Sequence, residues 1–407
     1  MFDYQMQRNI ASLFFLLILF SQVSARPFQK NSEAIDFVSD ISYKFGDQIS
    51  FTGKISPLLD IHQAILFIQT SPVNTSSIPL VLNAQQEFFY RLDLSTDPIT
   101  PFSTIHYWIE IQHNDGTSQL SPIKAFRYLD NRNIWMTKSS YPFIIHWQGD
   151  SSQLGQTVLP IVQQSLQAIQ TVLPVPDLTD IDIFIYNSPG DLREAIPINQ
   201  SDWMAAHVDP ESQVMLISIT DPPDQIIQMK RQIPHELMHL ILWKISPDAY
   251  DQIPVWLKEG LATTVELSPE AEYYTILQNA VNTNSLIPFS ELCTSFPQDI
   301  GSVYLSYAQS ASFTRYLIQN YGSQKLLDLI HSFNNNSDCL TPIKLTYGMG
   351  LDELSQNWIK DQFGVVSISH ALNAFTPWLV VLLLVLITPV LLFATFSNHP
   401  IPSQDEK

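Results

Sequence analysis

Cysteine and basic side chains are scarce in this sequence. Its 407 residues include 2 cysteines, Cys293 and Cys339, which are too few for a zinc site built from cysteine ligands. Lysine and arginine together number 20 against 39 acidic residues, for a formal net charge of -19. Because phosphate backbones need a positive surface, we expect no nucleic-acid partner. The two thiols leave one disulfide and two unpaired cysteines equally open, since sequence does not give their separation.

The long apolar runs lie at the two ends of the chain. Arg8 precedes an apolar run over residues 11–20, and small residues follow it, which is the pattern of a secretory signal peptide at 1–25. Residues 375–396 contain no charged side chain and match the roughly 20 apolar residues that cross a bilayer. We therefore expect a single transmembrane helix there, a cytoplasmic tail at 397–407, and the body of the chain on the extracytoplasmic face of the cell membrane.

Residues 34–130 alternate apolar and polar side chains with a period of two. Ile105, Tyr107 and Ile109 show the alternation most clearly, and the hairpin turn Asn114-Asp-Gly116 follows them. Short strands separated by turn residues predict an antiparallel β-sandwich of the immunoglobulin or fibronectin type. Nothing in this domain indicates chemistry, and its partner is unknown.

The period changes after a linker near residues 131–142. Apolar residues recur at helical spacing between Leu154 and Val172, and the stretch from Ile181 to Tyr186 alternates like a half-buried strand. A second strand is predicted just beyond residue 213, and helical patterns dominate from about residue 224 onward. Residues 141–364 are therefore predicted to form an α+β domain.

Residues 235–239 carry the spacing His-Glu-x-x-His. Residues four apart lie on one face of a helix, so His235 and His239 can direct ring nitrogens at one ion while Glu236 lies beside it as a base. Zinc in a hydrolase needs a third protein ligand, and Glu259 lies on the next predicted helix. The sequence therefore predicts a Zn²⁺ site formed by His235, His239 and Glu259, with Glu236 as the catalytic base.

This arrangement resembles the gluzincins of the peptidase MA superfamily, which pair His-Glu-x-x-His with a glutamate on the following helix. Trp256-Leu-Lys-Glu-Gly-Leu-Ala262 is similar to their W-L-x-E-G-x-A motif. The segment from Tyr304 to Leu317, with the following Tyr321-Gly322, is similar to the helix after their zinc helices. The resemblance covers residues 141–364 and implies a thermolysin-like zinc peptidase domain. The G-x-M-E-N motif of alanyl-type aminopeptidases is missing upstream, so the resemblance favours an endopeptidase.

The resemblance also implies a mechanism for hydrolysing peptide or protein substrates. Glu236 would assist attack by zinc-bound water, taking its proton and delivering it to the leaving amine. Tyr307 is the predicted donor to the developing oxyanion, because tyrosine has this role in several gluzincins. Tyr304 and His207 compete for that role, and a packing role for Tyr307 stays open.

Metal-bound histidines are oriented by partners that accept the remaining ring proton. Thr263 and Glu266 lie one and two turns beyond Glu259 in the predicted helix and are the expected partners. An exposed acidic side chain without this role is the alternative for Glu266.

Two other functions fit the same residues. The ligands could hydrolyse a non-peptide amide, or the chain could be a surface-exposed binding or scaffold protein with a relic peptidase domain. The intact Glu236 argues against a relic, because binding requires no base beside the metal. The predicted fold class is multidomain: an all-β sandwich, a thermolysin-like α+β zinc peptidase domain and one C-terminal transmembrane helix.

Overall fold

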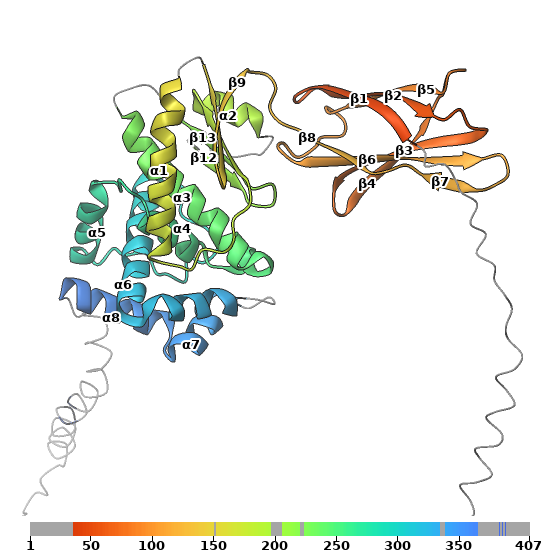
Figure 1. Cartoon of the computed structure of the whole chain (residues 1–407). Coiled ribbons are helices and arrows are strands. Elements are labelled where there is room, and N and C mark those ends of the chain that lie inside the picture. The colour runs from red at the N-terminus through yellow and green to blue at the C-terminus, as the bar shows by residue number, and fades with distance from the viewer. Residues whose placement is uncertain are drawn as a thin grey trace, which may run out of the picture. The chain divides into compact units, whose positions relative to one another are not determined.

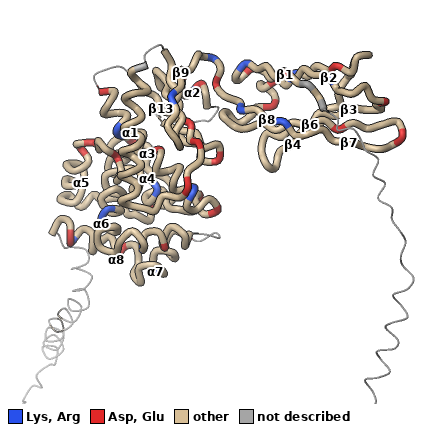
Figure 2. Tube along the Cα trace, in the orientation of Figure 1, with Lys and Arg blue, Asp and Glu red and all other residues tan. Residues whose placement is uncertain are grey.

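The computed structural model describes residues 36–149, 152–196, 206–219, 224–333 and 338–364, with single positions at 382, 385 and 387. The described residues divide into two compact units (Figure 1). Unit 1 contains residues 36–43, 48–93 and 105–126, and unit 2 contains residues 44–47, 94–104 and those from 127 onward. Acidic positions recur along both units (Figure 2), so the negative charge does not come from one segment. The predicted signal peptide lies outside the described residues.

Unit 1 consists of two β-sheets. One sheet has the order β1 (Asp36–Lys44), β2 (Gln48–Ser56), β5 (Glu87–Asp93). The other has the order β4 (Asn74–Leu80), β3 (Ile61–Ser71), β6 (Thr104–His113), β7 (Ser118–Leu120), with β8 (Lys124–Arg127) also paired to β6. The pairs β2–β5, β3–β4, β3–β6 and β6–β7 are antiparallel.

Alternating side chains explain why the two sheets of unit 1 pack face to face. On β6, Ile105, Tyr107, Ile109 and Ile111 are buried and lie on one face of the strand. The ring of Tyr107 lies 5.5 Å from that of Phe51 on the opposite sheet. The structure thus has the β-rich N-terminal region that the alternation predicts.

Unit 2 is built on a mixed five-stranded sheet. Its order is β12 (Ala206–Asp209), β13 (Val214–Ser218), β11 (Ile181–Tyr186), β10 (Phe143–Gln148), β9 (Trp135–Ser140). The inner pairs β13–β11 and β11–β10 are parallel, and the outer pairs are antiparallel. All residues of β11 are buried, so the prediction of a half-buried strand is wrong: β11 is a central strand that is covered on both faces.

Helices make up the rest of unit 2. They are α1 (Ser152–Gln170), α2 (Pro189–Ala195), α3 (Gln225–Ile245), the 3-10 helix η1 (Pro247–Gln252), α4 (Val255–Thr264), α5 (Glu272–Asn282), α6 (Ile300–Ser332), α7 (Thr341–Tyr347) and α8 (Leu351–Phe363). Helices α1 and α3 pack together against the sheet (Figure 1). Their apolar residues join those of β10, β11 and β13 in one buried core.

The opposite face of the sheet, which we call the far face, holds a buried charged cluster. Asp182 on β11 forms ion pairs with Arg127 and with His146, whose Nε2 lies 2.6 Å from Asp182 Oδ1. The rings of His146 and Phe102 both pack against Phe184, the next residue of β11 on this face. Arg127, His146 and Asp182 are called the far-face cluster below.

The predicted fold class is wrong in its last element, the transmembrane helix. Within the described residues, no helix combines the length and the apolar composition that crossing a bilayer requires. The predicted span and tail, residues 375–407, lie outside the described residues apart from positions 382, 385 and 387. The prediction rested on the length and apolar composition of residues 375–396. The structure has a β-rich N-terminal region followed by a helical C-terminal part.

Candidate metal centre

Helix α3 supplies two histidines on one face. His235 and His239 lie one turn apart, with ring centroids separated by 5.1 Å. Leu237, Leu240 and Ile241 are fully buried in the core of unit 2, so α3 is fixed by packing on its other sides. The helix therefore presents both imidazoles toward one point.

Helix α4 supplies the glutamate, and backbone hydrogen bonds hold the start of this helix. The N–H groups of Val255 and Trp256 donate to the carbonyl oxygens of Cys293 and Leu292, at 2.9 and 3.0 Å. These bonds satisfy first-turn donors that have no side-chain cap. A disulfide joins Cys293 to Cys339, with Cα atoms 6.1 Å apart, so the segment that holds α4 is itself fastened.

Gly260 lets α4 pack directly on α6. A Cβ atom at this position would stand 2.6 Å from the carbonyl oxygen of Ser310 on α6 and would also clash with Thr314 Oγ1. Only glycine fits such a close approach of two helices. Glu259 is the preceding residue, so its position depends on this contact.

The ligand atoms of the three predicted residues converge. Glu259 Oε2 lies 3.2 Å from His235 Nε2 and 3.6 Å from His239 Nε2. Zinc bonds of about 2.0–2.1 Å in tetrahedral geometry place ligand atoms about 3.3 Å apart. One ligand atom from each residue lies within 4.8 Å of the others. His235, His239 and Glu259 therefore form a cluster that fits a metal ion, and we call it the metal centre.

Each histidine has a partner on its other ring nitrogen. His235 Nδ1 lies 3.1 Å from Glu266 Oε1, and His239 Nδ1 lies 3.4 Å from the hydroxyl of Tyr250. Glu266 is one of the two partners expected from the sequence. The other, Thr263, has a buried hydroxyl with no hydrogen-bond partner among the described residues. Tyr250 lies in η1, where no sequence pattern indicates contact with the histidines.

A proline in α3 explains how Glu266 reaches His235. Pro234 lies inside the helix and has no N–H, so the carbonyl of Lys230, four residues earlier, lacks its helical donor. The N–H of Leu267 donates to that carbonyl instead, at 2.9 Å. This bond ties the segment after α4 to α3 one turn before His235, with Glu266 adjacent to the tie.

Negative charge gathers around the histidines. Burial lowers the pKa of His235, but hydrogen bonds to Glu259 and Glu266 outweigh it and raise this pKa well above its usual value. Burial raises the pKa of Glu259, but the facing His239 and His235 outweigh it and hold this pKa far below its usual value. The two effects have one cause, which is that these carboxylates are stabilised by a positive charge between them. A bound cation would supply the same positive charge.

Glu236 lies beside the metal centre with a half-buried side chain. Its charge contributes to the raised pKa values of Tyr250 and Tyr307, after burial and Glu259. In the part of the chain that the structure describes, no residue forms a hydrogen bond or ion pair with its carboxylate. The carboxylate is therefore available to a proton of a bound molecule.

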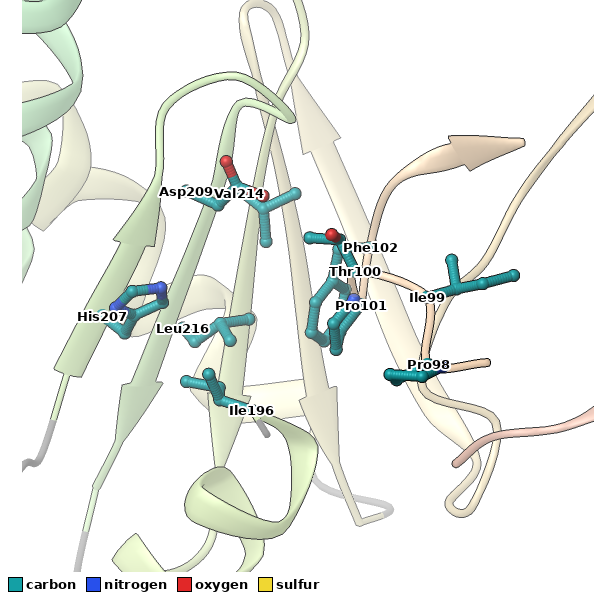
Figure 3. Close-up of a pocket in the computed structure, with 10 residues that line it drawn as sticks. All are labelled: Pro98, Ile99, Thr100, Pro101, Phe102, Ile196, His207, Asp209, Val214 and Leu216. Carbon is teal, nitrogen blue, oxygen red and sulfur yellow. The ribbon is translucent and has the colours of Figure 1, made fainter. Parts of the chain in front are cut away.

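Of the three predicted oxyanion donors, Tyr307 lies beside the metal centre. Its ring centroid is 6.1 Å from that of His235, and burial raises its pKa, so the phenol stays protonated. Tyr304, one turn earlier, packs on Tyr273 instead. His207 lies on β12 and lines a cavity of about 390 Å³ together with residues 98–102 (Figure 3).

Residues 162–362 match the family model of the peptidase MA superfamily. The match includes every residue of the metal centre and supports a peptidase MA-like assignment for this part of the chain. It therefore indicates a peptidase-like hydrolase.

Other comparisons contribute no argument about function. No curated protein matches the sequence. The β-1,3-glucan binding domain of carbohydrate-binding module family 56 is 13% identical, with 23% of this chain and 99% of that chain covered and a TM-score of 0.17. A purple acid phosphatase from yellow lupin seeds is 11% identical, with 46% and 35% covered and a TM-score of 0.20. A polysaccharide deacetylase from Bacillus cereus is 9% identical, with 46% and 60% covered and a TM-score of 0.20. These TM-scores are too low for a structural inference.

Proposed function

We propose that the chain is a zinc-dependent metallopeptidase that cleaves peptide bonds within protein substrates. The convergence of His235 Nε2, His239 Nε2 and Glu259 Oε2 carries the proposal, because separations of 3.2 and 3.6 Å suit ligands of one ion. The donor set of two imidazoles and one carboxylate is that of zinc hydrolases. The peptidase MA match over residues 162–362 supports the same conclusion.

The residues around the metal centre have separate tasks. Zinc held by His235, His239 and Glu259 would supply a Lewis acid for the scissile carbonyl and would lower the pKa of water toward neutral. Glu236 takes a proton from the attacking water and passes it to the leaving amine. The protonated phenol of Tyr307 donates a hydrogen bond to the oxygen on which negative charge develops. Glu266 and Tyr250 keep the two imidazoles oriented.

An extended peptide is the substrate that the sheet favours. β12 is the last strand in the order of the described sheet, so one of its sides has no described strand beside it. A peptide can pair with such an edge through its backbone without presenting a free terminus. The missing G-x-M-E-N motif also favours cleavage within a chain.

The disulfide supports a location outside the cytoplasm. Bonds such as Cys293–Cys339 persist in oxidising compartments and are rare in the cytosol. The secretory pattern of residues 1–25 agrees with this proposal. Thiol labelling of the chain isolated without reductant tests it, and free thiols in the folded chain would contradict it.

The deciding experiment measures metal content and cleavage of an unfolded protein by the full chain and by Glu236→Gln. We expect one zinc per chain in both, and a loss of cleavage of about a hundredfold or more in the variant, since only the base is removed. Glu272→Gln, the same change at an exposed position of α5, is the control and retains cleavage. Bound zinc without cleavage by the parent would refute the peptidase proposal, and a chain that binds no zinc would refute the assignment of the metal site.

A further inference from the structure

A second cavity in unit 2, of about 380 Å³, borders the metal centre. Tyr307, whose ring lies 6.1 Å from that of His235, forms part of its wall. Tyr304 and Val303 from the start of α6, Tyr273 from the first turn of α5 and Glu270 from the segment before α5 form further parts. The mechanism assigns no task to any of these residues except Tyr307.

The segment after α4 links this cavity to the reacting groups. Glu266 contacts His235, and four residues later Glu270 forms an ion pair with Arg231, one turn before His235 on α3. The segment therefore runs alongside α3 from one contact to the other. Glu270, at the end of this segment, belongs to the cavity wall, so one segment contacts both His235 and the cavity.

The cavity wall is apolar apart from a few neutral polar groups and one carboxylate. The rings of Tyr273, Tyr304 and Tyr307 and the side chain of Val303 supply apolar faces. Burial raises the pKa of Tyr273, which keeps its hydroxyl neutral. Glu270 is the charged residue of the wall, and Arg231 already balances it. Such a wall favours uncharged groups and disfavours a carboxylate.

The size and the opening of the cavity suit one side chain. Small-molecule pockets span about 300–1,000 Å³, so a cavity near the lower end accepts a compact group rather than an extended ligand. Ile300 at its edge is 79% exposed and Tyr304 is 38% exposed, so the mouth is open to solvent. A group can enter from a peptide that lies outside.

We propose that this cavity receives a large uncharged side chain of the substrate, aromatic or long aliphatic, from a residue next to the scissile bond. This inference rests on the proposed peptidase function and specifies the substrate class. It assigns the specificity to Tyr304 and Val303, which line the cavity without contacting the metal centre.

The test maps the bonds that the zinc-loaded full chain cleaves in a mixture of unfolded proteins, using mass spectrometry. We expect large uncharged residues to exceed small and acidic ones by about ten- to a hundredfold at one position beside the cut, from the apolar area that they bury. Tyr304→Ala should abolish most of this preference, and Tyr304→Phe should retain it. Val303→Trp should fill the cavity and shift the preference toward small residues.

Tyr274→Ala is the matched control, because Tyr274 neighbours Tyr273 on α5 but is 72% exposed and does not line the cavity. It should keep the preference of the parent. Cleavage with the same preference in the parent, Tyr304→Ala and Val303→Trp would overturn the cavity assignment and leave the peptidase intact. No cleavage by the zinc-loaded parent would overturn the peptidase and the assignment with it.

Discussion

Unit 2 contains two buried groups of carboxylate and imidazole side chains, and they differ in what balances their charge. In the far-face cluster, the side chain of Asp182 is 4% exposed and forms ion pairs with both Arg127 and His146. Burial raises the pKa of Asp182, but hydrogen bonds from His146 and Arg127 outweigh it, so the net shift is downward. This group is complete within the chain.

In the metal centre, imidazoles rather than arginine face the carboxylates. Among the residues that the structure describes, neither arginine nor lysine forms an ion pair with Glu236, Glu259 or Glu266. Among the described residues, the ion-pair partners of Glu259 and Glu266 are imidazoles, and the raised pKa of His235 lets a proton held there supply positive charge.

The difference distinguishes a cluster balanced by arginine from a cluster that could hold a metal ion. Buried charges cost free energy unless a partner compensates them. Where the chain provides arginine, the cluster needs nothing else. Where it provides only imidazoles, a proton or a bound cation can supply the positive charge, so this cluster is the one that could hold a metal ion.

Removing a metal ligand should have the largest effect, and it should affect the metal centre without changing the far-face cluster. Glu259→Gln replaces the only carboxylate of the metal centre, so we expect loss of bound zinc and a fall in kcat/KM on the order of a thousandfold. Metal analysis of the purified chain and a peptide cleavage assay measure both effects. His146→Gln changes the far-face cluster and should leave zinc binding unchanged; a Glu259→Gln chain that still holds one zinc would refute the assignment of this ligand.

The far-face cluster should respond in stability rather than in metal binding. Asp182→Asn leaves Arg127 without its charged partner, and we expect unfolding to become easier by about 2–3 kcal/mol, below the value for fully buried pairs because Arg127 is 36% exposed. Urea unfolding of the full chain measures this change. Unaltered stability would mean that the ion pair contributes little, and lost zinc would mean that the two groups are coupled.

The pH dependence sharpens this prediction. Asp182 has a lowered pKa in the folded chain, so its stabilisation is fully present above the ordinary value of 3.8 and is lost as pH falls through the folded value. The difference in unfolding free energy between the parent and Asp182→Asn should therefore stay constant down to a pH of about 3.8 and shrink below it. Urea midpoints measured across acidic pH give the profile, and a difference that shrinks near neutral pH would contradict it.

A methyl group added at the contact between α4 and α6 should affect both stability and the metal centre. Gly260→Ala forces a Cβ against Ser310, and we expect a loss of about 1–3 kcal/mol from overpacking, with weaker zinc binding because Glu259 shifts. Thermal unfolding and zinc titration measure the two effects. Gly350→Ala is the control, since a Cβ there meets no atom within 4 Å. Normal stability in Gly260→Ala would contradict the close contact.

The smallest expected effect comes from the proline in α3. Pro234→Ala supplies an N–H that competes with Leu267 for the carbonyl of Lys230, so Glu266 should orient His235 less well. We expect zinc affinity to fall by about tenfold, the scale of outer partners of metal ligands. Competition with a zinc chelator measures it. Pro160→Ala, a proline change inside α1, should leave the affinity unchanged; equal effects of the two would point to general helix changes.

Local geometry made the metal centre predictable. His235 and His239 are four residues apart in one helix, so their common face follows from the helical repeat alone. Glu259 was expected from a motif, and the structure brings it to the same point. Glu266 was one of two expected partners, but choosing it over Thr263 required the bond between Leu267 and Lys230, which depends on the lacking N–H of Pro234.

The remaining parts depend on contacts between segments far apart in the chain. Cys293 meets Cys339 across 46 residues, which no short-range pattern indicates. Tyr250 is only 11 residues from His239, but its contact depends on how η1 turns back after α3. The transmembrane helix was inferred from the length and apolar composition of residues 375–396, and no helix among the described residues supports it.

By itself, the sequence determined the change from alternating to helical patterns and the spacing of the histidine pair, because both follow from the repeat of a single strand or helix. Only the tertiary structure decided which carboxylates have arginine partners and which face imidazoles alone. That distinction depends on packing between distant elements, and it separates the far-face cluster from the metal centre.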